Sequence, residues 1–382
     1  MLFLSLKILT GDKAKFIGII LGLSFASFII VQQAAIFTGL MARTFGFITD
    51  TSQPDIWVMD EKVQFIDDIK PLRDTQLYLV RGVEGVEWAT PLYKGLLKAR
   101  LQNGNFQICH LIGIDEASLI GGPPVMLQGN ILDLRKTDGI IVDNVGAEGK
   151  LSSNGKNGRP LRVGETVEIN DRRAQVVGIC SSTRTFQSQP VIYTTYARAV
   201  SLAPYERKLL SFILVKGKTD LSSEKLCERI RSLPGLTAYT SSQFKRLTVE
   251  YYIKNTGIPL NFGIAVLLGF IIGMAISGQT FYNFILDNLR YLGTFKAMGA
   301  DNRLLSEMIL LQAVWVGFIG WGLGIGAAAL FGFLSRNSDL SFLLMWQLYL
   351  ISGITMFTIT GFSAWIGLYK VYRLDPAIVF RG

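Results

Sequence analysis

The side chains that most often carry out chemistry are few in this chain and stand far apart. The 382 residues include a single histidine, His110, and three cysteines, Cys109, Cys180 and Cys227. Catalytic histidine constellations and zinc sites need clusters of such residues, and three cysteines allow at most one disulfide. His110 lies in an apolar run, so we expect a buried, hydrogen-bonded structural histidine. We expect the cysteines to be small core residues or unpaired thiols.

Acidic and glycine-rich motifs also fail to indicate a catalytic site. The neighbours Asp67 and Asp68, and likewise Asp115 and Glu116, would splay apart on a helix, and we expect them on solvated faces. The sequence contains no G-x-x-x-x-G-K-[ST] phosphate loop. It also contains no G-x-S-x-G, H-E-x-x-H or C-x-x-C motif. We therefore expect no catalytic residue, no metal site and no cofactor bound by this chain.

The charged residues are unevenly distributed along the chain. They make up 18% of the residues, against about 25% in average proteins. The net charge of +9 is scattered and forms no basic face of the kind that binds nucleic acid. Four long stretches hold no charge, namely residues 16–42, 256–286, 308–335 and 340–369. Because about 20 predominantly apolar residues span a bilayer, the sequence predicts four transmembrane helices.

Basic residues beside these stretches predict an orientation. They occur in residues 1–15, which we expect to be a cytoplasmic amphipathic segment, in the loop 287–307 and in the tail 370–382. The positive-inside rule places all three on the cytoplasmic side. The first apolar stretch is too long for the apolar core of a cleaved signal peptide. Both termini are then cytoplasmic, and residues 43–255 lie outside the cytoplasm.

Residues 43–255 have the composition of a folded, water-exposed domain. Apolar alternation and short apolar runs predict strands at 55–59, 95–101, 106–114, 139–142, 166–169, 174–179, 191–194 and 212–216, and helical patterns occur at 70–81, 194–202, 222–233 and 241–254. This order predicts an α+β domain in two lobes between the first two membrane helices. The last helix has Ser241 and Ser242 as candidate N-caps. It leads directly into the second membrane helix, which suggests a rigid helical stalk.

Small residues recur inside the apolar stretches at the spacing that lets membrane helices approach closely. They include Gly18 and Gly22 in the first stretch, Gly269 and Gly273 in the second, and Gly322 and Gly326 in the third. Two roles remain open for these glycines, packing within the chain or a dimer interface. A bundle of only four helices favours a dimer.

The loop after the second apolar stretch has the most specific pattern. Apolar residues recur at every third position from Leu289 to Met298, with polar or basic residues between them, and Gly299 follows. This pattern predicts a short amphipathic helix along the membrane face. We expect Gly299 to end this helix and Asp301 to cap the third membrane helix.

The same loop resembles a known family. The run from Arg290 to Ala300, RYLGTFKAMGA, resembles the R-E-I-G-x-L-K-A-x-G-A signature of FtsX-like, or MacB-type, ABC transporter permeases. The order of the domains, the glycine-rich third helix and the closing segment 372–377 are similar to the same family. The segment 53–58 and the lack of a fused ATPase look most like its DevC branch.

The resemblance implies that the loop forms a coupling helix that docks on a separate ATP-binding subunit, which uses ATP and Mg. The residues expected to serve this helix are Arg290, Tyr291, Leu292, Gly293, Phe295, Lys296, Gly299 and Ala300. Two departures from the family concern the charge contact to the ATPase. Tyr291 takes the place of a common glutamate, and Gln312 takes that of an acidic residue early in the third membrane helix.

The function that the resemblance implies is that of a homodimeric permease subunit of an ABC export system in the bacterial inner membrane. Such a subunit would transmit ATP-driven motion to its outer domain and expel a lipid-like, lipoprotein or other amphiphilic cargo. A periplasmic membrane-fusion adaptor and an outer-membrane channel would be its partners. The alternative is an FtsX-like signal transmitter that transports nothing and controls a cell-wall hydrolase. The absence of catalytic motifs argues against a third alternative, a membrane-anchored enzyme.

Overall fold

The computed structural model describes residues 2–101, 103–153, 158–204, 209–336 and 338–372. The chain divides into two compact units. One combines Met1–Leu40 with Gly257–Gly382 and is called here the helical unit, and the other is Met41–Thr256, called the inserted domain.

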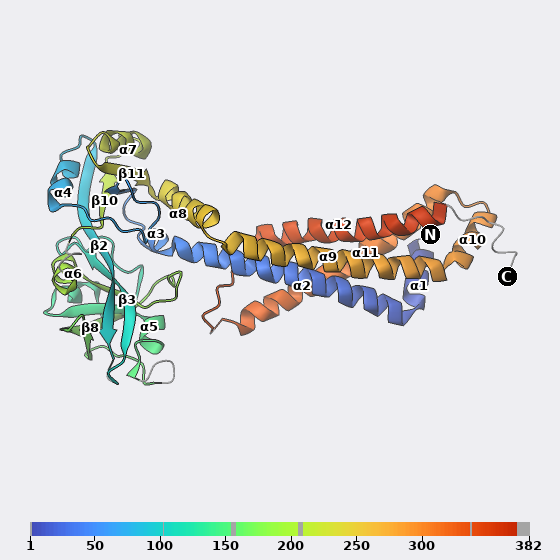
Figure 1. Ribbon diagram of the computed structural model, residues 1–382, viewed down its shortest axis with the longest axis horizontal. Coiled ribbons are helices and arrows are strands. Elements are labelled where there is room, and N and C mark those ends of the chain that lie inside the picture. The colour runs from blue at the N-terminus through green and yellow to red at the C-terminus, as the bar shows by residue number, and fades with distance from the viewer. Residues whose placement is uncertain (1, 102, 154–157, 205–208, 337, 373–382) are drawn as a thin grey trace. The chain divides into compact units, whose positions relative to one another are not determined.

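The helical unit is built from helices, four of them long. Its elements are α1 (Leu2–Gly11), α2 (Lys13–Thr44, which runs on into the inserted domain), α9 (Ile258–Asp287), α10 (Leu289–Ala297), α11 (Asn302–Leu334) and α12 (Trp346–Tyr372). Within the described residues, four of these, α2, α9, α11 and α12, are long and apolar enough to cross a membrane. They lie side by side (Figure 1). The four expected helices are therefore present.

One hydrophobic core holds the helical unit together. It is built from buried side chains of these helices, among them Ile19, Leu23, Phe281, Phe284, Leu305, Val316, Met356 and Ile359. Leu9 of α1 belongs to the same core and is almost fully buried. This part of the expected amphipathic segment thus packs against the bundle itself.

The fourth long helix begins later than the expected residue 340. Residues 340–345 are not helical, and α12 starts at Trp346. The backbone N–H of Leu343 donates to the carbonyl oxygen of Ala35 in α2 at 3.0 Å. Gly39 allows this close approach, since a Cβ there would lie 2.8 Å from Ser341 Oγ. The N–H of Leu343 bonds to α2 and so is not used in a helical hydrogen bond. Helix α12 therefore starts later than we predicted.

The inserted domain mixes strands and short helices. In chain order they are α3 (Gly46–Asp50), β1 (Ile56–Asp60), α4 (Asp74–Arg81), β2 (Val86–Arg100), β3 (Phe106–Ile114), β4 (Val125–Gln128), the 3-10 helix η1 (Ile131–Arg135), β5 (Gly139–Asp143), α5 (Asn144–Glu148), β7 (Thr166–Ile169), β8 (Arg172–Ser181), β9 (Val191–Thr195), α6 (Tyr196–Leu202), β10 (Phe212–Gly217), α7 (Ser223–Arg231), β11 (Leu236–Thr240) and α8 (Ser241–Asn255). The α+β class of the domain is confirmed.

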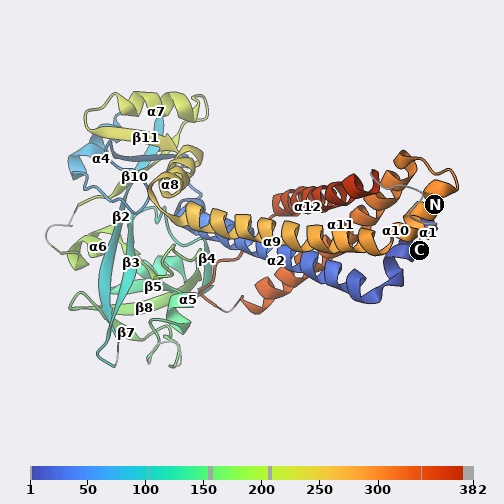
Figure 2. The same cartoon turned by 45° about the vertical axis from the view of Figure 1, so that its right-hand side comes forward.

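The described strands form one sheet in the order β11-β1-β10-β2-β3-β9-β5-β8-β4, and β7 pairs with both β2 and β8. Most pairs are antiparallel, while β3–β9 and β5–β8 are parallel. The 15-residue strand β2 runs through the middle of the domain (Figure 2). The helices α4 and α7 cover the end of the sheet that holds β1, β10 and β11, and α6 packs on the part that holds β3 and β9.

The N-cap of helix α8 lies one residue before the caps that we expected, and α8 does not continue into α9. Its N-cap is Thr240, whose hydroxyl accepts from the N–H of Gln243 while the Gln243 side chain accepts from the N–H of Thr240. This reciprocal capping box leaves the Ser241 hydroxyl free to donate to the carbonyl of Pro54. Thr256 and Gly257 separate α8 from α9, so the expected continuous stalk is two helices joined by a short break.

Candidate functional site

The start of the short helix α10 is held at the end of the helical unit by contacts of the two residues that precede it. Helix α9 ends at Asp287, and the side-chain amide of Asn288 donates to the carbonyl of Phe284 at 2.8 Å. The ammonium of Lys15, near the start of α2, forms an ion pair with Asp287. Figure 1 shows α10 at the same end of the bundle as α1. The start of α10 is thereby tied to two of the long helices.

One face of α10 packs into the hydrophobic core of the helical unit. Leu292 is 5% exposed and Gly293 is buried, while Leu289 and Phe295 are half-buried against the same core. These side chains are covered by their own chain. Leu292, Gly293 and Phe295, which we expected to serve docking, thus also hold the helix on the bundle.

The opposite face of α10 is not covered by any residue that the structure describes. Tyr291 and Met298 expose 64% and 68% of their surface, and Thr294 and Ala297 are exposed between them. We call these four residues the outer face of α10. Met298 and Ala297 are absent from the residues that the sequence pattern singled out for docking. The side chain of Arg290 lies outside the described part of the structure.

The end of α10 has the geometry of a Schellman motif. Gly299 has φ +96°, which glycine adopts without the steric cost that other residues meet. Its N–H donates to the carbonyl of Lys296 at 3.1 Å, and the N–H of Ala300 donates to that of Phe295 at 2.9 Å. Phe295 and Ala300 also pack on the same core, the hydrophobic contact that accompanies this motif. Gly299 and Ala300 thus fix where α10 stops, and Lys296 places a positive charge in its last turn, where the helix dipole favours it.

The third long helix begins directly after this turn. Asp301 occupies the N-cap position of α11 with extended backbone angles, as expected, but its side chain makes no capping hydrogen bond. Ser306 and Tyr372 bond through their hydroxyl groups at 2.9 Å, which links the start of α11 to the end of α12.

The glycines at helix-packing spacing divide into two groups. A Cβ at Gly22 would lie 2.5 Å from Ile276, one at Gly273 would lie 2.7 Å from Ala26, and one at Gly269 would lie 3.2 Å from Ile29. These three glycines therefore let α2 and α9 approach closely. Added Cβ atoms at Gly18, Gly322 and Gly326 would meet nothing described within 4 Å. The packing glycines of α11 are instead Gly317, Gly320 and Gly324, which face Thr360, Leu23 and Ser27.

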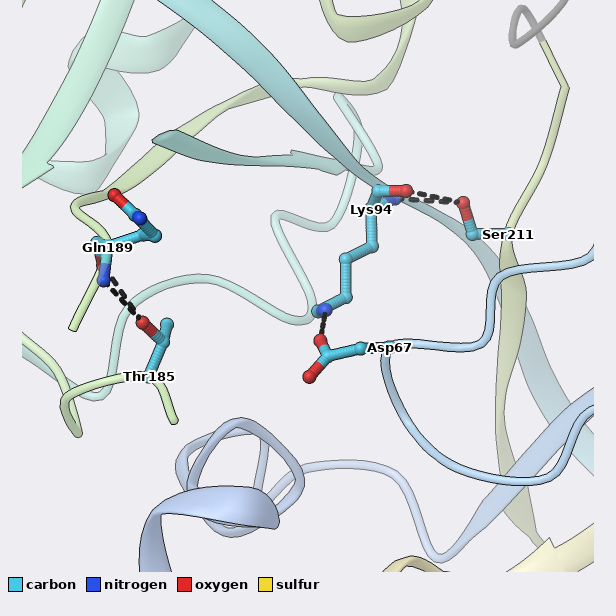
Figure 3. A network of polar contacts seen from close by, with 5 residues as sticks. All are labelled: Asp67, Lys94, Thr185, Gln189 and Ser211. Carbon is cyan, nitrogen blue, oxygen red and sulfur yellow. Dashed lines mark hydrogen bonds and ion pairs between the residues drawn. The ribbon is translucent and has the colours of Figure 1, made fainter. Parts of the chain in front are cut away.

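The inserted domain contains a buried lysine that is paired with an exposed aspartate beside a cavity. Lys94, whose side chain is 4% exposed, forms an ion pair with Asp67, and Figure 3 shows the two side chains pointing toward each other. Burial alone would raise the pKa of Asp67, but the Lys94 ammonium outweighs burial and holds that pKa below its usual value. Both residues line a cavity of about 330 Å³ together with His110 and Ser211. A lysine within the apolar run of β2 was the only sequence signal for this site, and we missed it.

His110 and the acidic pairs differ in part from the sequence prediction. His110 is buried as expected, yet its Nδ1 has no hydrogen-bond partner among the described residues. Burial, and then the nearby Lys94, lower the pKa of His110 to about 3. Asp67 is exposed, as expected, although its carboxylate pairs with the buried Lys94. Glu116 accepts from the backbone N–H of Ala197 at 2.7 Å and so also has a structural role.

The described residues provide no metal cluster of three or more His, Cys, Asp or Glu side chains. Cys109, Cys180 and Cys227 are all unpaired and buried, as expected. Burial raises the pKa of the Cys109 thiol to about 12 and that of the Cys227 thiol to about 11. Such thiols are poor nucleophiles.

Comparisons with known proteins cover both units. A family model for a MacB-like periplasmic core domain matches residues 16–233. A second model, for the C-terminal part of FtsX-like permeases, matches residues 263–376. The chain belongs to the MacB/FtsX-type family of ABC transporter permeases. In this MacB/FtsX-type permease, α10 falls within the FtsX-like match and most of the inserted domain within the MacB-like match.

The chain is also similar to several individual proteins. An uncharacterized ABC transporter permease of Mycobacterium tuberculosis is 25% identical over 222 residues, 58% of this chain and 58% of its own. One from Methanocaldococcus jannaschii is 23% identical over 240 residues, 59% of each chain. The periplasmic region of MacB from Actinobacillus actinomycetemcomitans is 20% identical, covers 55% of this chain and 96% of its own, and has a TM-score of 0.39. The MacB/FtsX-type permease described here thus matches less than two thirds of the length of these curated relatives.

Proposed function

We propose that this chain is the membrane subunit of an ABC export system and that the outer face of α10 docks on a separate ATP-binding subunit. Family membership and the relatives named ABC transporter permeases support the first part. The division of α10 into a packed face and an uncovered face supports the second. On this proposal the chain binds no cofactor, and ATP and Mg are used by the partner.

The outer face has the chemistry of a small protein interface. Aromatic residues and methionine are enriched in the cores of protein interfaces, and Tyr291 and Met298 are the large side chains of this face, exposed by 64% and 68%. Methionine adapts its shape to a partner surface. Contact with the ATPase then rests on apolar surface, which fits the tyrosine that stands where the family often has glutamate.

The inner face of α10 explains how docking would reach the rest of the chain. Leu292 and Phe295 are packed into the same core as side chains of α9, α11 and α12. Protein interiors are close-packed and transmit strain. A push on the outer face would therefore shift the long helices as a group, and α9 continues through a two-residue break into α8 of the inserted domain.

The remaining parts of the proposal concern location and assembly. Basic residues around α10 favour a cytoplasmic position, with both termini on that side of the bacterial inner membrane and the inserted domain in the periplasm. The open glycines Gly322 and Gly326 support a homodimer. We propose an amphiphilic cargo, such as a lipid or lipoprotein, and a periplasmic adaptor, with the resemblance to the DevC branch as support.

A matched pair of tyrosine substitutions tests the docking role. Tyr291→Asp places a charge on the outer face of α10, while Tyr78→Asp changes a tyrosine of similar exposure, 67%, in the inserted domain. We expect Tyr291→Asp to reduce co-purification of the ATP-binding subunit at least tenfold and Tyr78→Asp to leave it unchanged. Equal co-purification of both variants would contradict the docking role of α10.

A further inference from the structure

The sheet of the inserted domain has a gap on one side of β2. Strand β10 pairs with β2 only as far as Leu92, and β7 pairs with it again from Ala99. Between these pairings, the Ser211 hydroxyl takes the place of a strand. It accepts from the N–H of Lys94 at 2.9 Å and donates to the carbonyl of Lys94 at 3.1 Å (Figure 3). The gap therefore lies beside residues 95–98.

The backbone groups of Leu96 point into this gap. Alternate residues of a strand direct their N–H and C=O to the same side. Leu92 and Lys98 both accept on the gap side, from the N–H groups of Ser211 at 3.0 Å and Asn170 at 2.9 Å. Leu96 belongs to the same series of alternate residues, and no described residue is paired with it on that side. An unpaired N–H and C=O on a strand edge form a template for another strand.

The cavity of about 330 Å³ lies at the same place. Its lining includes Gly95, Leu96, Leu209 and Ser211 along the gap, and Pro71 on the facing loop. This volume is at the lower end of the range of ligand sites. The distance from Lys94 to Lys98 along an antiparallel strand is roughly 14 Å. The gap and cavity together suit an extended segment of about four residues.

The exposed surface beside the gap is apolar and basic. Leu96 is 43% exposed, and Ile108 and Phe106, which follow on the neighbouring strand, are 46% and 61% exposed. Lys98 and Arg100 are exposed on the same face. Arg100 lies 3.6 Å from Glu168, whereas Lys98 has no ion pair with any described residue. A segment with acidic and apolar residues would complement this surface.

We propose that the gap beside Leu96 is a docking site for an extended acidic and apolar segment of a partner protein, which joins the sheet as a short added strand. The backbone of the segment pairs with the N–H and C=O of Leu96. An apolar side chain enters the cavity, and an acidic side chain faces Lys98. This mode of recognition takes its affinity from main-chain hydrogen bonds and its selectivity from side-chain pockets.

The loop that borders the cavity also contacts helix α8. Phe65 stacks on Tyr251 of α8 with ring centroids 4.2 Å apart and an interplanar angle of 16°, and Asp67, two residues later, lines the cavity. A shift of α8 would therefore move one wall of the docking site. The site deepens the proposed function in this respect, since it offers a place where motion of the inserted domain can act on a partner.

The test uses the full chain in detergent and a fluorescein-labelled, N-acetylated peptide with the sequence Leu-Glu-Val-Glu-Leu. We expect binding by fluorescence polarisation, at least tenfold weaker binding when the central amide nitrogen is methylated, and at least tenfold weaker binding when lysine replaces both glutamates. Lys98→Glu should reverse the charge preference, and Lys225→Glu, on an exposed helix of the same domain, should not. Hydrogen exchange of the Leu96 amide should slow at least tenfold when the peptide is bound.

Each of three results would overturn the proposal. The peptide could fail to bind at millimolar concentration, the methylated peptide could bind equally well, or Lys98→Glu could keep the preference for the acidic peptide. A Leu96 amide that is already protected without peptide would mean that this chain or a second copy fills the gap. Co-purification of the ATP-binding subunit, measured in the same Lys98→Glu preparation, separates these outcomes from a failure of the proposed function, because Lys98 and α10 belong to different units.

Discussion

At the scale of single residues, the burial of His110 makes the stability of the inserted domain depend on pH. Burial and Lys94 lower the pKa of His110 to about 3, while Asp67 acts in the opposite direction. An unfolded histidine binds a proton below about pH 6.5. Between these two values the unfolded chain holds more protons than the folded one. The contribution of His110 to stability is therefore fully present above pH 6.5 and declines as the pH falls toward 3.

The direction of this pH dependence predicts how the stability of His110→Gln changes with pH, since glutamine cannot be protonated in this range. Between pH 6.5 and pH 5, the free energy of unfolding of the unsubstituted chain should fall more steeply than that of the variant, by up to about 1.4 kcal/mol per pH unit. Hydrogen exchange of the amides in β3, measured across this range in the full chain, gives the free energy. Parallel curves for the two proteins would show that His110 is protonated in the folded state.

The ion pair between the buried Lys94 and Asp67 shows where sequence reasoning stopped at this scale. The burial of His110 follows from its apolar neighbours, whereas the spacing of the cysteines left one disulfide open and the structure shows all three unpaired. The partner of Lys94 lies 27 positions away in the chain, so the pair depends on a loop path that no local pattern contains. An isolated lysine between Tyr93 and Gly95 in an apolar strand was nevertheless a sign that a partner exists, because unpaired charges are rarely buried.

At the scale of elements, the two faces of α10 explain both the success and the failure of the sequence prediction. The pattern correctly indicated a helix that glycine ends. It placed apolar residues at every third position, but each step of three residues turns an α-helix by about 300°, so Met298 lies about 180° from Leu289. The first three apolar residues pack on the bundle and Met298 is exposed. The apolar residues at every third position therefore lie on two faces of α10 and not on one.

Strand prediction failed where burial and alternation were weak. β3 and β7 have the predicted bounds, because apolar and β-branched residues recur throughout both segments. β4 is mostly exposed and therefore lacks a periodic signal, and the first half of β2 contains Pro91, which usually argues against a strand interior. In the structure Pro91 lies opposite Ile213, at a position where the strand tolerates it.

The glycines of α11 give a matched prediction for helix packing. A Cβ at Gly324 would meet Ser27 Cβ and would lie 2.8 Å from the Ser24 carbonyl oxygen, while one at Gly326 would meet nothing within 4 Å. Gly324→Ala should destabilise the helical unit by about 1–3 kcal/mol, the usual cost of overpacking. Gly326→Ala should not destabilise it, since alanine is the better helix former. Thermal unfolding of both variants in detergent provides the comparison, and equal losses would contradict the assigned packing.

A larger side chain at the open position tests the dimer. Gly326→Leu should leave the unfolding temperature of the monomer unchanged and weaken self-association, which sedimentation in detergent measures. An unchanged association state would assign Gly322 and Gly326 to a lipid-facing surface.

At the scale of the whole molecule, composition alone located the membrane helices, since charge is absent from residues that must lie in hydrocarbon. It also located the inserted domain, whose composition is that of a soluble protein. The family followed from one loop motif and the order of the domains, and the two family models together cover most of the chain. The sheet order and the gap beside Leu96 depend on long-range strand pairing, which single-sequence patterns do not specify.

The central claim is that the outer face of α10 contacts an ATP-binding subunit. The most direct measurement places a photoreactive amino acid at Met298, and separately at Phe295 and at Leu127, an exposed residue of the inserted domain, in cells that contain the complete export system. We predict cross-links to the ATP-binding subunit from position 298, and none from positions 295 and 127. Absence of an ATPase cross-link at 298, or equal cross-linking from 127, would contradict this account.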